Sequence, residues 1–341
     1  MTGPSKAIAG LQRFGYTERQ AAFLQIVALH GGYFLRRQYE FFIGNEKGGS
    51  SQRFMEVLVQ KGHATVLTFC DNTVVCHLAA RAFYRVVGNE HSRNRRFHQP
   101  FTVKSKLMAL DFILSRKDVQ FIATERERVA LFRETLRVPI SALPAKSYQS
   151  KGGGTRTVRY FVDRNPVFIS AAAEGAVPVV GFAYIDAGSD TTAGFRTYLA
   201  QYRRLFKALD NFLIVYVSSH SRLVPAASKD FRKALRSEAA SSSGPQPETV
   251  RLLAHFEARL CHERRDYAGF DTAKLQRLSR ELKELSGPRY DALFTLYRTE
   301  GTASVLRELG ESAAIQAPEK GSFEGCVLGY SYAFLGDEWA A

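Results

Sequence analysis

The sequence predicts a mixed α/β fold, because two buried strands flank one amphipathic helix. The runs 177–185 and 212–217 are almost continuously apolar and β-branched, which is typical of strands buried on both faces. Between them, apolar side chains recur at helical spacing at seven positions: Phe195, Tyr198, Leu199, Tyr202, Leu205, Phe206 and Leu209. A helix that crosses over between two buried strands forms a βαβ unit. We expect the stretch 155–220, which contains this unit, to be the α/β core of the protein.

Further elements are predicted upstream of this unit. Two strands precede it, TRTVRYFV at 155–162 and VFIS at 167–170, and Asp163 lies in the turn between them. Before these, a helix, a strand and a second helix are indicated over 103–116, 119–123 and 124–136. Residues 138–154 are expected to be a surface connection. Residues 124–218 are therefore predicted to run helix, three strands, helix and strand.

Length and cysteine content limit the class of protein. A chain of 341 residues can hold two or three domains. Its four cysteines are too few and too scattered for a disulfide framework. The beginning of the sequence has no signal-peptide pattern, and nowhere do 18 apolar residues follow one another. We expect a soluble, cytoplasmic protein that does not associate with a membrane.

The net charge of +14 is concentrated in the N-terminal part of the chain. Residues 1–137 hold 21 basic and 11 acidic side chains, and hence +10 of this charge. A positive field raises the local concentration of a polyanion and speeds its encounter. A basic surface without a dedicated partner would have the same composition, so charge alone does not decide between the two.

A winged helix is predicted over residues 1–90. Thr17 and Gln20 can form a capping box before an apolar helical stripe that ends at Gly31-Gly32. Two more short helices follow, one over 35–43 and one that begins after Gly48-Gly49-Ser50. Apolar side chains then recur at every second position on both sides of a turn at Asp71-Asn72, and this spacing predicts a hairpin. Three helices and a hairpin in this order are typical of the winged form of the helix-turn-helix.

The third helix is the candidate reader of double-stranded DNA, because in this architecture it enters the major groove. Gln52 and Arg53 lie in its first turn, and both side chains can make bidentate contacts to purines, while Lys61 is available at its end. The alternative is a dimerisation or packing module whose third helix is only solvated.

The two alternatives predict different surfaces. A reading helix requires residues 51–61 and the hairpin tip at Asp71-Asn72 to be exposed to solvent. Three residues of the third helix are expected to be buried against three of the first: Phe54, Val57 and Leu58 against Phe23, Ile26 and Val27. If Gln52, Arg53 and Glu56 were instead covered by the helix at 193–210 or by the C-terminal tail, assembly with other proteins would be favoured.

Cysteine and histidine also occur in and beside the hairpin. His63, Cys70, Cys76 and His77 lack the Cys-x2-Cys spacing of a zinc site. Cys76 alternates with Val74 and Leu78, as an inward-facing strand residue does. We therefore predict no metal here.

A basic connector is predicted over residues 91–102. Arg93, Arg95 and Arg96 can contact phosphates, and Arg81 lies on the short helix just before them. A flexible linker of the same composition is the alternative. The expected domains are the winged helix at 1–90, this connector, an α/β domain at 103–240 and a C-terminal helical region with a tail at 241–341.

The order of elements over 124–218 resembles the core of the restriction-endonuclease-like fold. In that fold, an acid ends the second strand and an acid-x-Lys group lies on the third, and the acids hold Mg²⁺. Asp163 and Asp186 match the acids, but the position two after Asp186 is Gly188 and the position two before it is Tyr184. Lys207 lies on the polar face of its helix and does not replace the lysine. The resemblance therefore implies a catalytically degenerate domain without a cofactor, and the alternative is a Mg²⁺-dependent nuclease with an atypical site.

The sequence resembles the replication-relaxation proteins of plasmids and other mobile elements in four features: the winged helix, the basic connector, Asp186-Ala187-Gly188 and Tyr202. The resemblance covers about residues 15–220. It implies a non-enzymatic DNA-binding accessory factor of a bacterial mobile element, acting in replication, transfer or transcription control. Its partners would be double-stranded DNA and a second copy or other mobile-element proteins. A protein-assembly module to which nucleic acid is irrelevant is the third hypothesis.

Beyond the core, helices are predicted on both sides of a linker. They are expected over 225–240, 248–267, 272–285 and 289–299. The tail contains Tyr330, Tyr332, Phe334 and Trp339, and aromatic side chains of this size must pack on something. Their own chain and a second copy are both open as partners.

Overall fold

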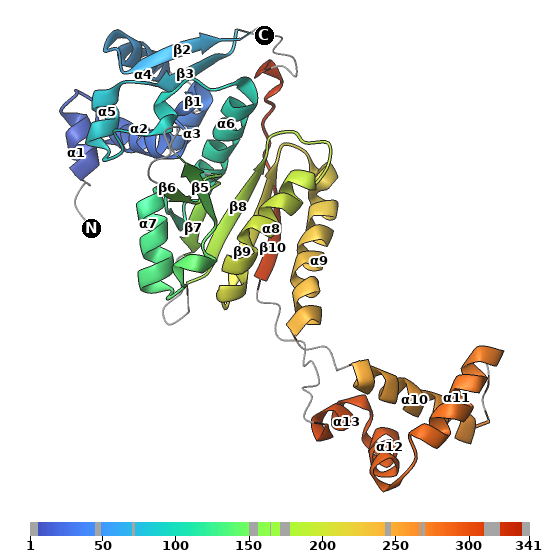
Figure 1. Ribbon diagram of the computed structural model, residues 1–341. Helices are drawn as coiled ribbons and strands as arrows, with labels where there is room; N and C mark the ends of the chain where they lie inside the picture. The colour runs from blue at the N-terminus through green and yellow to red at the C-terminus, as the bar shows by residue number, and fades with distance from the viewer. Residues whose placement is uncertain are drawn as a thin grey trace. The chain divides into compact units, whose positions relative to one another are not determined.

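The computed structural model describes residues 6–44, 49–69, 72–149, 156–163, 165–170, 178–242, 247–265, 267, 270–309 and 321–335 (Figure 1). The protein has mixed α/β structure and divides into two compact units. The first unit combines residues 1–232 with residues 320–341, and the second consists of residues 233–319. The second unit is thus inserted into the sequence of the first.

The N-terminal module of the first unit is helical with one small sheet. Its elements are α1 (Lys6–Gln12), α2 (Glu18–His30), β1 (Tyr33–Leu35), α3 (Arg36–Ile43), α4 (Gly49–Gln60), β2 (Ala64–Thr68), β3 (Val74–Leu78) and α5 (Arg81–Val86). The capping box of Thr17 and Gln20 at the start of α2 is confirmed. The predicted hairpin is β2 and β3, and β1 joins it in the antiparallel order β1-β3-β2. The strand β1 and the helix α1 were not predicted.

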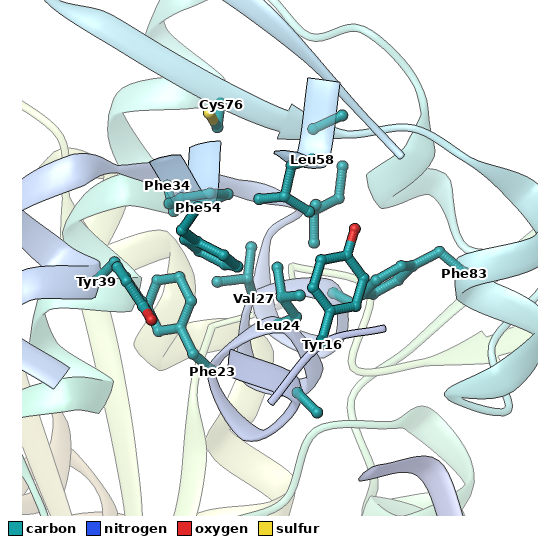
Figure 2. Close-up of a cluster of buried hydrophobic side chains, with 14 of the residues drawn as sticks. Tyr16, Phe23, Leu24, Val27, Phe34, Tyr39, Phe54, Leu58, Cys76 and Phe83 are labelled. Atoms are coloured by element: carbon teal, nitrogen blue, oxygen red, sulfur yellow. The ribbon is translucent and has the colours of Figure 1, made fainter. Parts of the chain in front are cut away.

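A core of aromatic side chains holds this module together (Figure 2). Phe54 of α4 lies against Phe23 of α2, with the ring centroids 6.4 Å apart, and Leu58 is fully buried in the same cluster. Val27 is also buried in this cluster, and Val57 and Ile26 pack against it. The predicted inward face of α4 is therefore confirmed. Cys76 belongs to the same core, which confirms that it faces inward as a small apolar residue. Its burial raises the pKa of the thiol to about 12.

The first unit also contains a five-stranded mixed sheet in the order β10-β9-β8-β7-β4. Its strands are β4 (Val119–Phe121), β7 (Val167–Ser170), β8 (Val180–Asp186), β9 (Phe212–Ser218) and β10 (Gly321–Val327). The last three are parallel, and β4 and β7 are antiparallel to their neighbours. The helix α8 (Ala193–Ala208) crosses from β8 to β9, so the predicted βαβ unit is confirmed.

Helices cover both faces of this sheet. On one face, α6 (Pro100–Ser115) contributes Leu107, Met108 and Phe112 to a core shared with Val215 and Val217 of β9. On the other face, the ring of Phe206 in α8 packs edge-on against Phe182 of β8, at a centroid distance of 5.3 Å. The helix α9 (Val224–Ser242) begins beside α8, and its Phe231 contacts Phe212 and Phe323. The sheet is therefore the middle layer of three.

Two predictions for the segment before the sheet are wrong. Residues 145–149 form the strand β5 (Ala145–Gln149) rather than part of a surface connection. The strand predicted at 155–162 is present as β6 (Arg156–Tyr160), but it pairs with β5 in a separate two-stranded sheet instead of belonging to the core sheet. The physical reason is exposure: the side chains of β5 and β6 are nearly all exposed, so their pairing is held by backbone hydrogen bonds and leaves little apolar pattern to read.

The helix predicted at 124–136 is divided. It begins with a capping box of Thr124 and Glu127, runs as α7 (Glu125–Ala130) and continues as a π-helical turn (Leu131–Thr135). A 3₁₀ turn (Ile140–Ala142) follows before β5.

The segment 321–335 returns to the first unit. Its strand β10 pairs in parallel with β9, and a 3₁₀ turn (Ala333–Leu335) follows it. Tyr332 is buried and donates a hydrogen bond to Asp111 of α6, and the ring of Tyr330 lies under the guanidinium of Arg37, 3.8 Å from its Cζ. These aromatic residues thus pack on their own chain. Trp339 lies outside the described residues.

The second unit is a helical cluster with its own small core. Its helices are α10 (Pro247–Glu263), α11 (Thr272–Glu284), α12 (Pro288–Glu300) and α13 (Thr302–Glu308). Apolar side chains of α10, α12 and α13 meet at Leu252, Phe256, Leu293, Phe294 and Val305. The helix α13 was not predicted. Across the described part of the chain, none of the helices is both long and apolar enough to cross a membrane.

Candidate nucleic-acid interface

The outward face of α4 is exposed to solvent. Gln52, Arg53 and Glu56 are all exposed, and the Gln52 amide donates to the Glu56 carboxylate at 3.0 Å. At the hairpin tip, Asn72 is exposed and adopts a left-handed φ of 60°, while Asp71 lies outside the described residues. The amphipathic spacing of α4 explains this arrangement, because the same period that buries Phe54 and Leu58 turns the polar residues outward.

A groove of about 980 Å³ lies along this face of α4. Gln52, Glu56 and Val59 of α4 form one wall, and Val66 and Asn72 of the hairpin line the groove as well. Its rim is completed by the tail, at Ser331, Ala333 and Phe334. The ring of Phe334 contacts Phe69 at the end of β2, with the centroids 5.7 Å apart. The tail therefore supports the hairpin and borders the groove without burying Gln52, Arg53 or Glu56.

Lys61 is held at the end of α4 by contacts within the module. Its Nζ donates to the Phe14 carbonyl at 2.6 Å and lies 4.9 Å from the centre of the Tyr16 ring. The Tyr16 hydroxyl oxygen forms a hydrogen bond with Nδ1 of His63, at a distance of 2.7 Å. Lys61 is exposed, but its ammonium group closes the loop between α1 and α2.

Arg81 has a partner on the protein. Glu90 accepts ion pairs from Arg81 at 2.6 Å and from Arg85 at 3.0 Å. The hydrogen bond from Arg85 and the charges of both arginines lower the pKa of the Glu90 carboxyl to about 2. The positive charge of this corner is thus partly neutralised.

The connector is folded against the N-terminal module. A 3₁₀ turn (η1, Arg93–Arg95) buries Asn94, whose side-chain amide donates to the Ala28 carbonyl at 3.1 Å. His77 of β3 donates from Nε2 to the Asn94 carbonyl at 2.9 Å and stacks on Tyr33. The described connector is therefore packed on the module rather than exposed as a flexible linker, because the side chain of Asn94 satisfies a carbonyl of α2 and its backbone carbonyl accepts from His77 of β3.

The three connector arginines have different surroundings. Arg95 is half-buried and donates to the backbone carbonyls of Ala79 and Glu90, at 3.3 and 3.2 Å. Arg93 and Arg96 are exposed and line a second hollow, of about 310 Å³, that shares no residue with the groove along α4. Of the predicted DNA contacts, Gln52 thus lines the groove along α4, and Arg93 and Arg96 line this separate second hollow.

Asp163 and Asp186 are both engaged in hydrogen bonds of the fold. Asp186 is buried, and its carboxylate accepts from the Tyr216 hydroxyl at 2.5 Å and from the backbone amides of Gly188 and Ser189 at 3.2 and 2.8 Å. These bonds cap the loop after β8, where Gly188 adopts a φ of 117° that favours glycine.

Asp163 has a different set of partners. Its carboxylate accepts from the Tyr202 hydroxyl and from the backbone amide of Asn165, each at 3.1 Å. In the part of the chain that the structure describes, no three His, Cys, Asp or Glu side chains are grouped so as to hold a metal ion.

Two basic residues of this region were not singled out from the sequence. Lys104 of α6 approaches the loop after β8 so closely that a Cβ built on Gly188 would lie 2.9 Å from its Nζ. Arg128 of α7 is only 4% exposed and lines the second hollow. The one available signal for Arg128 is its position four residues before the buried Phe132, on the same helical face.

Comparison with known proteins adds no relative. No family model matches the chain, and neither the curated proteins nor the solved structures give a significant match.

Proposed function

We propose that this protein binds double-stranded DNA through α4 and is a non-enzymatic factor of a bacterial mobile element, located in the cytoplasm. The observation that carries the binding proposal is the free outward face of α4, with Gln52 and Arg53 exposed above a buried aromatic core. An α-helix with its side chains is about 10–12 Å wide, and the major groove is about 12 Å wide, so the reading face must be unobstructed.

The order of elements supports the same proposal. The succession α2, β1, α3, α4, β2 and β3, with an antiparallel three-stranded sheet, is typical of a winged helix. The charge of the N-terminal 137 residues, +10, favours a polyanionic partner. The assignment to a mobile element depends only on the resemblance to replication-relaxation proteins.

Duplex binding at increasing salt tests the proposal. Counterion release gives a slope of about −0.9 in log affinity per log salt for each phosphate that is neutralised, so affinity should fall steeply. Arg53→Ala should reduce the preference for the best sequence by about 1–3 kcal/mol. Arg133→Ala removes the same charge from an exposed position far along the sequence and serves as the control. An affinity that is flat with salt would refute DNA binding.

A Mg²⁺-dependent nuclease is the second candidate, and Lys104 is the observation that favours it. This lysine brings a positive charge to the loop that Asp186 caps. In that loop the acid-x-Lys position after Asp186 is held by Gly188 instead of a lysine. Against it, the Asp186 carboxylate already accepts three hydrogen bonds, which leaves it few lone pairs for a metal. Nicking of supercoiled plasmid in Mg²⁺ or Mn²⁺ that is lost in Asp186→Ala would establish this activity and displace the first proposal.

An assembly module is the third candidate. It is favoured by two exposed aromatic side chains four residues apart, Phe97 and Phe101, which are 57% and 62% exposed. A protein that forms stable oligomers through these residues and binds no duplex at low salt would support it.

A further inference from the structure

The second hollow contains a buried guanidinium. Arg128 of α7 donates from Nε to the Ile122 carbonyl at 2.9 Å, and its Cζ lies 5.8 Å from the centre of the Phe161 ring. The side chain is 4% exposed, so nearly the whole charge is removed from bulk water. This cost is several kcal/mol for a buried ion unless a partner of opposite charge offsets it.

Among the described residues, Arg128 has no carboxylate at ion-pairing distance, and none accepts a hydrogen bond from its Nη1 or Nη2. Asp163 and Glu127 act on it only through longer-range attraction, and burial lowers the pKa of the guanidinium. Two strong donors of a planar fork are therefore available on a residue that lines the hollow.

The surroundings of Arg128 are basic. Arg93 and Arg96 line the same hollow from the connector. Glu125 is the acid of the lining, and it is already bound by Arg159 at 2.9 Å and by the Tyr160 amide at 2.8 Å. An anion that enters the hollow would therefore meet unneutralised positive charge.

The wall of the hollow is also strained. Phe161, whose ring lies beside the Arg128 guanidinium, adopts a φ of 50°, in the left-handed region that a bulky residue rarely occupies. Such strain costs about 1–3 kcal/mol and concentrates at ligand-binding positions. The volume of about 310 Å³ is that of a small ligand site.

We propose that this hollow is a phosphate-binding site in which the Arg128 guanidinium grips a phosphate group and Arg93 and Arg96 attract it at the rim. Paired N–H donors of arginine match two phosphate oxygens, which a chloride ion cannot exploit. The phosphate can belong to a small nucleotide or to the backbone of DNA. The site is independent of reading by α4, because it shares no residue with the groove along that helix.

Binding of inorganic phosphate to the purified full chain tests the site without DNA. The ³¹P line of phosphate should broaden with the unaltered protein, and phosphate should raise the melting temperature above that in chloride of equal ionic strength. Arg128→Gln should weaken binding about tenfold or more, which corresponds to about 1.4 kcal/mol. The matched control is Arg126→Ala, which removes a charge from an exposed position of the same helix and should leave binding unchanged.

A second variant keeps the test valid if Arg128→Gln does not fold. Replacing the exposed Arg93 and Arg96 together by alanine leaves the core intact and should also weaken phosphate binding. A folded Arg128→Gln protein that broadens the ³¹P line as the unaltered protein does would overturn the proposal, and so would identical melting temperatures of the unaltered protein in phosphate and chloride.

Competition identifies the source of the phosphate. If the site takes a small nucleotide, dAMP should release bound phosphate and a DNA duplex should not. If it takes the DNA backbone, the duplex should release it, and Arg128→Gln should weaken binding to all sequences alike. Phosphate binding without any duplex binding would refute the proposed function and leave this inference standing.

Discussion

Arg37 of α3 and Asp111 of α6 form a two-pronged ion pair, with N–O distances of 2.7 and 2.8 Å. The Asp111 side chain is 4% exposed and that of Arg37 is 30% exposed. Tyr332 donates to the same carboxylate, so the pair joins the N-terminal module, the helix under the sheet and the tail.

Breaking this pair should destabilise the first unit. Arg37→Ala leaves a buried carboxylate without its cation, which costs about 3 kcal/mol in the free energy of unfolding. Urea denaturation measures this loss. Asp190→Asn is the control, because the Asp190 side chain is 96% exposed and that of its partner Arg222 is 66% exposed. Loss of this pair should change the free energy of unfolding by less than about 0.5 kcal/mol. Equal effects of the two substitutions would contradict the role of burial.

A single added methyl group should disturb the central sheet. A Cβ on Gly181 of β8 would lie 2.1 Å from the Phe168 ring of the neighbouring strand, so Gly181→Ala should cost about 1–3 kcal/mol through overpacking. Thermal unfolding checks the direction. Gly329→Ala meets no neighbour within 4 Å and should be almost neutral, so a comparable loss there would argue against this explanation.

The stability of the first unit should decrease as pH falls from about 6.5 towards 3. Burial, with a smaller contribution from the charge of Arg128, lowers the pKa of His30 to about 3. Between these pH values the unfolded chain binds a proton that the folded protein does not. The free energy of unfolding therefore falls, through this group, by at most about 1.4 kcal/mol for each unit by which the pH decreases. His30→Gln should flatten the dependence of the melting temperature on pH in this window, and an unchanged slope would exclude His30 as its source.

Arg95 and Arg96 should behave differently although they are adjacent. Arg96→Ala should weaken binding to all DNA sequences alike, because its exposed side chain is placed to meet phosphates. Arg95→Ala should instead lower the free energy of unfolding by about 1–3 kcal/mol, since it loses two hydrogen bonds to backbone carbonyls. Parallel binding and denaturation curves separate the two effects. A stable Arg95→Ala protein with weakened DNA binding would reverse the assignment.

Elements with a strong apolar period were predictable from the sequence. The unit of β8, α8 and β9 and the inward face of α4 follow from spacing alone, because burial requires that spacing. The strands β1 and β10 carry much weaker signals. Three residues of β1 are too few to show a period, and β10 contains Gly321 and Gly325 and finds its partner about a hundred residues earlier in the chain.

The candidate sites show the same division. The exposure of Gln52 and Arg53 follows from the helical period, and the role of Asp186 as a capping group follows from its place at the end of β8. Which arginine of the segment Glu125–Ala130 becomes buried depends on how α7 meets the connector and β6. That contact is a property of the tertiary structure, and the spacing of Arg128 four residues before the buried Phe132 is the only local trace of it.

The position of β10 after the inserted unit also bears on how the protein is made. During synthesis, β9 leaves the ribosome about a hundred residues ahead of the strand that pairs with its free edge. At elongation rates of about 5–20 residues per second, this delay is roughly 5–20 s. For that time the nascent chain presents an apolar strand with unpaired N–H and C=O groups, which is the kind of segment that chaperones bind and that aggregates when they do not.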